Sequence, residues 1–170
     1  CTVAVLHFDA WIAERAAAHP ALAMWPGHNA YGTVSYGPVT DAACQAWLRE
    51  RYADRDGLNA TWNTAFWSQG YGEWEHVLAP QTTQYLPNPS HVLDFKRFCA
   101  DVLRDCLRDQ VAVLRAATPD VPITTNHMLP TWNHVDQGSI ARDGAIVSVD
   151  HYPSAPDSEG QAPVAFGHAP

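Results

Sequence analysis

The sequence predicts an α/β fold in which parallel strands alternate with helices, and three observations support this. Three short apolar runs, each followed by polar residues, have the length and composition of buried strands. Segments with helical periodicity separate these runs. The chain has 170 residues, of which 46% are hydrophobic and 16% charged, so it is long enough to bury a core and is unlike a disordered chain. Alternation of this kind is typical of a parallel sheet built from βα units.

The first predicted elements are a helix and a strand. His7 to His19 carries apolar residues on one helical face and is closed by Pro20. The run from Ala21 to Trp25 is short and apolar and is ended by Pro-Gly, which indicates a buried strand.

Three further helices are predicted in the middle of the chain. Thr40 to Tyr52 and Asp56 to Phe66 each begin with a residue type that caps helices. The longest helix follows Asn88-Pro89, with Ser90 as its N-cap. Its apolar positions recur at helical spacing for more than six turns: Val92, Phe95, Phe98, Cys99, Val102, Leu103, Cys106, Leu107, Val111 and Leu114. We expect its charged residues to form a solvated face: Asp94, Arg97, Asp101, Arg104, Asp105 and Arg108.

The last predicted strands are Val121 to Thr125 and Ala145 to Val149, separated by a weak helical stretch near Asn133 to Arg142. From Pro153 onward the composition changes to Pro, Ser, Gly and Ala, which indicates a loop-like tail. We therefore expect one domain over residues 1–152, followed by a tail over residues 153–170.

Charge and hydropathy exclude two classes of partner. The net charge is -8 and only ten residues are Lys or Arg, whereas nucleic acids and anionic membranes require clustered cations. The sequence has no apolar run of roughly 20 residues and no recognisable export signal, so we expect a cytoplasmic protein. The chain does not begin with Met, and we expect it to be an excerpt of a longer protein.

The four cysteines follow no known metal-binding spacing. Cys99 and Cys106 are seven residues apart on a predicted helix, about 10 Å along its axis, which is too far for a disulfide. We expect them to be buried thiols.

Polar residues follow all three predicted strands: His28-Asn29, Asn126-His127 and Asp150-His151-Tyr152. The carboxyl ends of parallel strands share one edge of the sheet, so these side chains are expected to meet there. They could instead simply mark where buried strands reach the surface. A further alternative is a metal-dependent hydrolase site formed by His28, His127, Asp150 and His151.

Several segments carry a resemblance that covers nearly the whole chain. They are Ala21-Leu-Ala-Met-Trp-Pro-Gly-His-Asn-Ala-Tyr-Gly32, Gly57-Leu-Asn-Ala-Thr-Trp-Asn-Thr-Ala-Phe-Trp-Ser-Gln69, Asn88-Pro89, Leu93-Asp-Phe-Lys-Arg-Phe98, Thr118-Pro-Asp-Val-Pro-Ile-Thr-Thr-Asn126 and Val149-Asp-His-Tyr-Pro153. These segments closely resemble glycoside hydrolase family 42, the bacterial β-galactosidases. The resemblance implies a partial (β/α)8 TIM barrel of about three parallel βα units, because a closed barrel needs roughly 250 residues.

The resemblance also implies roles for individual residues. The general acid/base Glu of the family is replaced by Ala30, which can neither give nor take a proton. Asn29 would bond a sugar hydroxyl and Trp67 would stack on a pyranose ring, although Trp67 could also be a core aromatic. The further candidate substrate-binding residues are Asn126, Asp150, His151 and Tyr152. Asp150 would hold a neighbouring His or a sugar hydroxyl.

Two of the family's features are not expected in these 170 residues. The nucleophilic Glu of the family lies on a later strand, beyond Ala162 to His168. The family's structural zinc site falls near Thr33 to Cys44, where this sequence retains only Cys44, so we predict no metal and no other cofactor there.

The sequence therefore predicts a β-galactosidase-like fragment with impaired catalysis whose ligand is a β-galactoside or galactose. A non-catalytic sugar-binding or self-assembling α/β module is the alternative. Three parallel strands leave two sheet edges unpaired, so we expect self-association or a complementary chain.

Overall fold

The computed structural model of the chain describes residues 3–29, 31, 35–127, 136–143 and 146–150, and for Trp67 the backbone alone. The elements are α1 (Val3–Ala16), β1 (Trp25–Pro26), α2 (Pro38–Arg51), α3 (Arg55–Trp62), the short 3-10 helices η1 (Phe66–Ser68) and η2 (Trp74–His76), α4 (Pro89–Ala117), β2 (Ile123–His127), α5 (Gln137–Asp143) and β3 (Ile146–Val149).

The three strands form one parallel sheet in the order β1-β2-β3, which confirms the predicted parallel arrangement. Trp25 pairs with Ile123, and Asn126 pairs with Ser148. The first strand is shorter than the predicted Ala21 to Trp25. The reason is a turn before it, in which the Leu22 N–H donates to the His19 carbonyl at 3.0 Å.

The second strand also differs from its predicted range, which was Val121 to Thr125. The Val121 N–H donates to the Thr118 carbonyl in a turn, so β2 begins at Ile123, and it continues to His127. The helix predicted near Asn133 to Arg142 is α5, described from Gln137.

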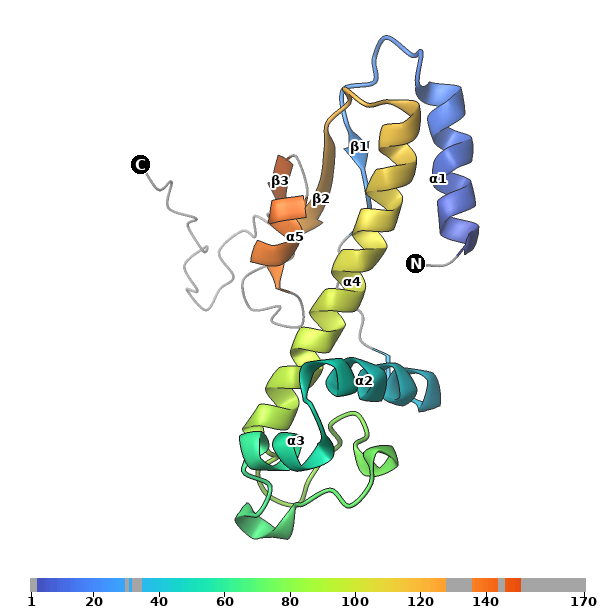
Figure 1. Cartoon of the computed structure of the whole chain (residues 1–170). Coiled ribbons are helices and arrows are strands. Elements are labelled where there is room, and N and C mark those ends of the chain that lie inside the picture. The colour runs from blue at the N-terminus through green and yellow to red at the C-terminus, as the bar shows by residue number, and fades with distance from the viewer. Residues whose placement is uncertain (1–2, 30, 32–34, 128–135, 144–145, 151–170) are drawn as a thin grey trace, which may run out of the picture.

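Helix α4 is shared by two regions of the molecule (Figure 1). Its N-terminal part lies against α2 and α3, and its C-terminal part lies beside α1 and the sheet. We call residues 35–99 the helical region, and we call the remaining described residues the sheet region. Among the described helices, none has the length and apolar character needed to cross a membrane.

The sheet region has an apolar core between the sheet and the two helices α1 and α4. Ala13, Trp25, Leu114 and Ile123 form one cluster. The Trp25 indole N–H donates to the Thr118 hydroxyl at 2.8 Å, so this buried aromatic has no unsatisfied polar atom. Tyr31, Leu107 and Ile140 form a second cluster nearby.

Gly27 allows close contact between the end of β1 and α4. A Cβ built on this residue would lie 3.0 Å from the Leu107 Cδ1 atom and 3.5 Å from the Thr124 carbonyl oxygen. A larger residue would therefore push β1 away from the helix.

The helical region has a core of its own. Its buried members are Cys44, Leu48, Leu58, Trp62, Val77, Ala79, Phe95, Phe98 and Cys99. Cys99 is buried as predicted, whereas Cys106 is only half-buried, and Cys44, Cys99 and Cys106 are all free thiols.

The prediction that Asp94 lies on a solvated face is wrong. Asp94 is 2% exposed and sits in the helical region. Its Oδ2 atom accepts hydrogen bonds from the Tyr52 hydroxyl at 2.5 Å and the Trp62 indole N–H at 2.9 Å, while Arg97 donates to Oδ1 at 2.9 Å. Position 94 lies four residues before buried Phe98, on the same helical face, and tertiary contacts bury it. Val102, predicted to be buried, is 48% exposed.

The caps of three helices also differ from those predicted. Asn88 caps α4 instead of Ser90, because its Oδ1 accepts from the Ser90 N–H at 2.9 Å and the His91 N–H at 3.2 Å. Asp54 caps α3 instead of Asp56, accepting from the Gly57 N–H at 2.7 Å. At α2 the N-cap is Gly37 instead of Thr40, with a φ of 134° that favours glycine.

Candidate functional site

The polar residues that follow the three strands meet at the carboxyl edge of the sheet. The Asn126 Nδ2 atom, at the end of β2, lies 3.2 Å from the Asn29 Oδ1 atom in the segment after β1. The same nitrogen donates to both carboxylate oxygens of Asp150, which follows β3, at 2.9 and 3.0 Å. Asn126 thus joins all three strand ends, and we call Asn29, Asn126 and Asp150 the strand-end cluster.

Backbone hydrogen bonds place this cluster. The Gly27 N–H donates to the Thr124 carbonyl at 2.7 Å, and the Asp150 N–H donates to the His127 carbonyl at 2.9 Å. The Thr125 hydroxyl donates to the His28 carbonyl at 3.1 Å, which attaches the segment after β1 to β2. The β2–β3 pairing also extends through His127, so the side chains of alternate residues are fixed in register.

A second set of contacts, which was not predicted from the sequence, holds Tyr31, next to position 30. The ring of Tyr31 stacks on His28 with centroids 4.3 Å apart. Its hydroxyl donates to the Gln110 Oε1 atom of α4 at 2.5 Å, and the Gln110 Nε2 atom donates to the Asp9 Oδ2 atom of α1 at 3.0 Å. Burial, followed by the nearby Cys106 and Asp9, raises the pKa of Tyr31 well above its usual value, so the hydroxyl stays protonated and acts as a donor.

The hydrogen-bonding groups of the strand-end cluster suit a neutral polyhydroxy ligand. It contains two amides and one carboxylate, which together supply donors and acceptors for hydroxyl groups. His127 follows Asn126 in β2, so its side chain lies on the other face of the sheet, where it is buried; burial lowers the pKa of its imidazole, so the ring is neutral at pH 7. The cluster contains one carboxylate, whereas a retaining glycosidase uses two that are about 5 to 5.5 Å apart.

The histidines of the predicted metal site do not gather into a group of ligands within the part of the chain that is described. There, no set of three His, Cys, Asp or Glu side chains is arranged to hold a metal ion. His28 stacks on Tyr31 instead and contacts the Asn29 carbonyl through Nδ1 at 3.1 Å. His151, the fourth predicted ligand, lies outside the described residues.

Other predicted site residues also fall outside the description. Ala30 and Tyr152 are among them. Trp67 is the central residue of η1, but only its backbone is described. Of the predicted substrate-binding residues, the structure therefore brings together Asn29, Asn126 and Asp150.

The fold and the cluster define a class of protein. Parallel strands with functional side chains at their carboxyl ends, connected by helices, are typical of α/β barrel enzymes. The model of glycoside hydrolase family 42, described as β-galactosidase, matches residues 3–169, and the chain belongs to this family.

Relatives of known sequence and structure are similar to the chain over most of its length. A β-galactosidase from Arthrobacter sp. is 44% identical over 159 residues, which are 91% of this chain and 23% of that protein. The β-galactosidase LacZ of Heyndrickxia coagulans is 39% identical and is matched over 84% of this chain and 22% of its own length. The chain thus spans less than a quarter of either relative.

Solved structures show the same architecture. The cold-adapted β-galactosidase from Rahnella sp. superposes with a TM-score of 0.83 and 30% identity over 88% of this chain and 22% of that chain. The β-galactosidase from psychrophilic Marinomonas ef1 gives a TM-score of 0.80 and 33% identity over 87% of this chain and 23% of that chain. These neighbours have TIM-barrel folds, and the three parallel strands of this chain are consistent with part of such a barrel.

Proposed function

We propose that the chain forms about three βα units of a family 42 barrel, over residues 1–152, and binds the galactosyl group of a β-galactoside at the strand-end cluster. The β-galactosidase relatives and the hydrogen-bonding groups of the cluster support this proposal. The residues proposed to contact the ligand are Asn29, Asp150, Trp67, His151 and Tyr152. We further propose that the chain alone does not turn over galactosides.

The observation that carries the proposal is the position of Asn126 between Asn29 and Asp150. Its NH2 group has two hydrogens, which serve one amide oxygen and one carboxylate. The Oδ1 atom of Asn29 is thereby engaged, so the remaining group of Asn29 is its NH2, a donor suited to a sugar hydroxyl. In this proposal Asn126 is a positioning residue that sets the orientation of the other two side chains.

The proposed loss of turnover follows from the acid/base position. Ala30 has no proton to transfer, and general acid catalysis is usually worth about 10² to 10⁴ in rate. Asp150, the one carboxylate of the strand-end cluster, cannot act as both acid and nucleophile.

Turnover is tested with purified chain and a chromogenic β-galactoside. We expect a rate no higher than background, and we expect Ala30→Glu to leave it there because the nucleophilic Glu, which the family resemblance places beyond Ala162 to His168, is still lacking. Turnover by the unmodified chain that disappears in Asp150→Asn would contradict the proposal and make Asp150 catalytic.

Binding is tested separately, by titrating galactose into isotopically labelled chain and following the side-chain amide signals of Asn29 and Asn126. We expect these signals to move with an affinity in the millimolar range or weaker. Asn126→Ala should reduce the affinity about fivefold or more, as expected for the loss of one or more hydrogen bonds. Glu14→Ala, on an exposed face of α1, is the control and should not change it. Saturable galactose binding that Asn126→Ala leaves unchanged would rule out this cluster as the site.

A second candidate function, an assembly module, is favoured by the exposure of β3. Ile146, Val147 and Val149 are 39%, 56% and 54% exposed although they are apolar strand residues. An exposed apolar edge strand is a template for pairing with another chain. We therefore also propose that the sheet region associates with a second copy of the chain or with a complementary chain.

A further inference from the structure

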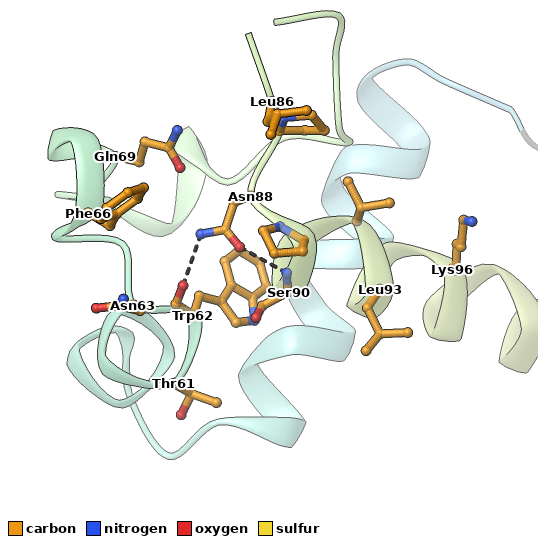
Figure 2. Close-up of a pocket in the computed structure, with 13 residues that line it drawn as sticks. Thr61, Trp62, Asn63, Phe66, Gln69, Leu86, Asn88, Ser90, Leu93 and Lys96 are labelled. Carbon is orange, nitrogen blue, oxygen red and sulfur yellow. Dashed lines mark hydrogen bonds between the residues drawn. The ribbon is translucent and has the colours of Figure 1, made fainter.

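The helical region contains a cavity that includes no residue of the strand-end cluster. It encloses about 770 Å³ between η1, the end of α3 and the first turns of α4. Figure 2 shows Phe66 and Gln69 on one side, Leu86 above and Leu93 on the opposite side, with Trp62 and Asn88 between them. This volume lies within the range of about 300 to 1,000 Å³ that is usual for small-molecule sites.

A second cavity of about 280 Å³ adjoins the first. Gln69, Pro87 and Asn88 line both. The two cavities therefore lie side by side along the segment that precedes α4, and we call them together the groove.

The middle of the groove is held in a fixed shape. The Asn88 Nδ2 atom donates to the Trp62 carbonyl at 3.0 Å, and its Oδ1 atom caps α4. Pro87 and Pro89, on either side of Asn88, each have a restricted φ angle. Because all of these constraints exist without a ligand, little ordering would be needed on binding.

The segment that carries Phe66 and Gln69 is also fixed. Asn59 donates to the Tyr71 carbonyl at 2.9 Å and accepts from the Tyr71 N–H at 3.0 Å. Thr64 is 2% exposed, and its hydroxyl donates to the Asn59 Oδ1 atom at 2.7 Å. The Gln69 N–H donates to the Thr64 carbonyl at 2.8 Å. The ring of Phe66 is nonetheless 59% exposed, at the wall of the cavity.

The chemistry of the lining selects a class of ligand. The net charge of the chain is -8, yet neither cavity is lined by a carboxylate, and Lys96 is the one Lys or Arg among the lining residues. The lining combines aliphatic side chains, an aromatic ring and proline rings with amides and hydroxyls: Leu78, Ala79, Leu86, Val92, Leu93, Phe66, Pro80, Pro87, Pro89, Asn63, Gln69, Gln81, Asn88, Thr61, Tyr71, Thr83 and Ser90. A cationic ligand would lack a counter-charge there, and a wholly apolar ligand would cover the side-chain amides of Asn63 and Gln69 without bonding them.

We propose that this groove is a binding site for a neutral oligosaccharide, with Phe66 stacking on the C–H face of one sugar ring and Gln69 bonding its hydroxyls. A sugar ring presents an apolar face and a rim of hydroxyls, which match the ring of Phe66 and the surrounding amides. No residue of the strand-end cluster lines this site, and binding there does not depend on turnover.

The test is a titration of the whole labelled chain with a linear β-galactotriose, followed by nuclear magnetic resonance. We expect the side-chain amide signals of Gln69 and Asn63 to move. Phe66→Ala should weaken this binding roughly threefold to tenfold, as expected for the loss of one aromatic contact. Phe66→Tyr should retain it, and Gln69→Ala should weaken it.

The matched control is Tyr85→Ala, which removes another exposed aromatic of the helical region, one that lines neither cavity. It should leave the affinity unchanged, and circular dichroism should show that all variants are folded. If the trisaccharide moves only the side-chain amide signals of Asn29 and Asn126, the groove site is overturned while the strand-end proposal stays intact. Two further outcomes would also overturn it. In one, the Gln69 signal moves with benzyl alcohol but not with the trisaccharide; in the other, it moves with neither.

Discussion

The helical and sheet regions share α4 but complete their cores to different extents. In the helical region, residues from α2, α3, η2 and α4 surround one apolar cluster, and the buried charge of Asp94 is met by three donors. In the sheet region, α1 and α4 cover part of the sheet, but Ile146, Val147 and Val149 of β3 remain exposed.

This difference in core completion implies that the two regions are stabilised in different ways. The helical region is stabilised by contacts within about 60 residues of the sequence, whereas the described sheet region keeps apolar strand surface in contact with solvent. We therefore expect changes in the helical region to affect folding of the chain, and changes on β3 to affect association.

The largest expected effect comes from Asp94→Ala. It removes the acceptor of the half-buried Tyr52 hydroxyl, one of the two acceptors of the Trp62 indole N–H, and the partner of Arg97. We expect a loss of about 3 kcal/mol in the free energy of unfolding, measured by denaturant titration. Asp105→Ala on the same helix is the control, because Asp105 is 66% exposed and its ion pairs are worth little. Equal losses in the two variants would show that Asp94 does not organise the helical region.

Acid should destabilise the helical region in two steps. Burial lowers the pKa of His91 below its usual 6.5, more than its contact with the Leu78 carbonyl raises it. Burial alone would raise the pKa of Asp94, but hydrogen bonds from Tyr52, Trp62 and Arg97 outweigh it, so this pKa lies below 3.8. In both cases the unfolded state binds more protons, so stability decreases as the pH falls below 6.5 and again below 3.8.

The measurement is the melting temperature as a function of pH. His91→Gln, which keeps a hydrogen-bond donor but does not titrate, should reduce the decrease between pH 7 and pH 5. Part of that decrease should remain, because burial also lowers the pKa of His127 in the sheet region. An unchanged profile in His91→Gln would contradict this assignment.

A smaller effect is expected from Tyr31→Phe, which tests how the sheet region holds Tyr31. The substitution leaves the buried Gln110 Oε1 atom without its donor. We expect a loss of about 1 to 2 kcal/mol in stability. Tyr36→Phe is the control, because Tyr36 is 63% exposed and packs on Phe95 through its ring. A loss as large as that of Asp94→Ala would mean that the two regions depend equally on their polar contacts.

The smallest effect on stability, and the clearest effect on association, is expected from Val147→Lys. Val147 is 56% exposed on β3, so the change should alter the free energy of unfolding by less than about 0.5 kcal/mol. We expect light scattering to show that the unmodified chain associates at tens of micromolar and that the variant does so less. A concentration-independent monomer for the unmodified chain would refute self-association.

Local sequence patterns predicted most of the secondary structure. The apolar period of α4 identified that helix, and alternation of helices with apolar runs identified the parallel sheet. The starts of β1 and β2 were predicted less accurately than the helices. The turns at Leu22 and Val121 depend on hydrogen bonds that the composition of an apolar run does not specify.

The strand-end cluster could also be predicted from the sequence, since the carboxyl ends of parallel strands share one edge of the sheet. Asn29, Asn126 and Asp150 meet as this argument predicts. The contact of Tyr31 with Gln110 could not be predicted, because the two are 79 residues apart and Gln110 belongs to no motif. The burial of Asp94 was missed for a related reason, since two of its donors, Tyr52 and Trp62, lie outside α4 and more than 30 positions away in the sequence.

The continuity of α4 through both regions has a consequence for the order of folding. Bonds that close the helical region, such as those from Tyr52 and Trp62 to Asp94, join residues 42 and 32 positions apart. Those that attach the sheet region to the end of α4 are longer in sequence, since Trp25 and Thr118 are 93 positions apart. Short loops close at lower entropic cost. Once the helical region has formed, α4 is a helix of about 43 Å. The strands, whose pairing is long-range and slower, can then pack against its C-terminal part.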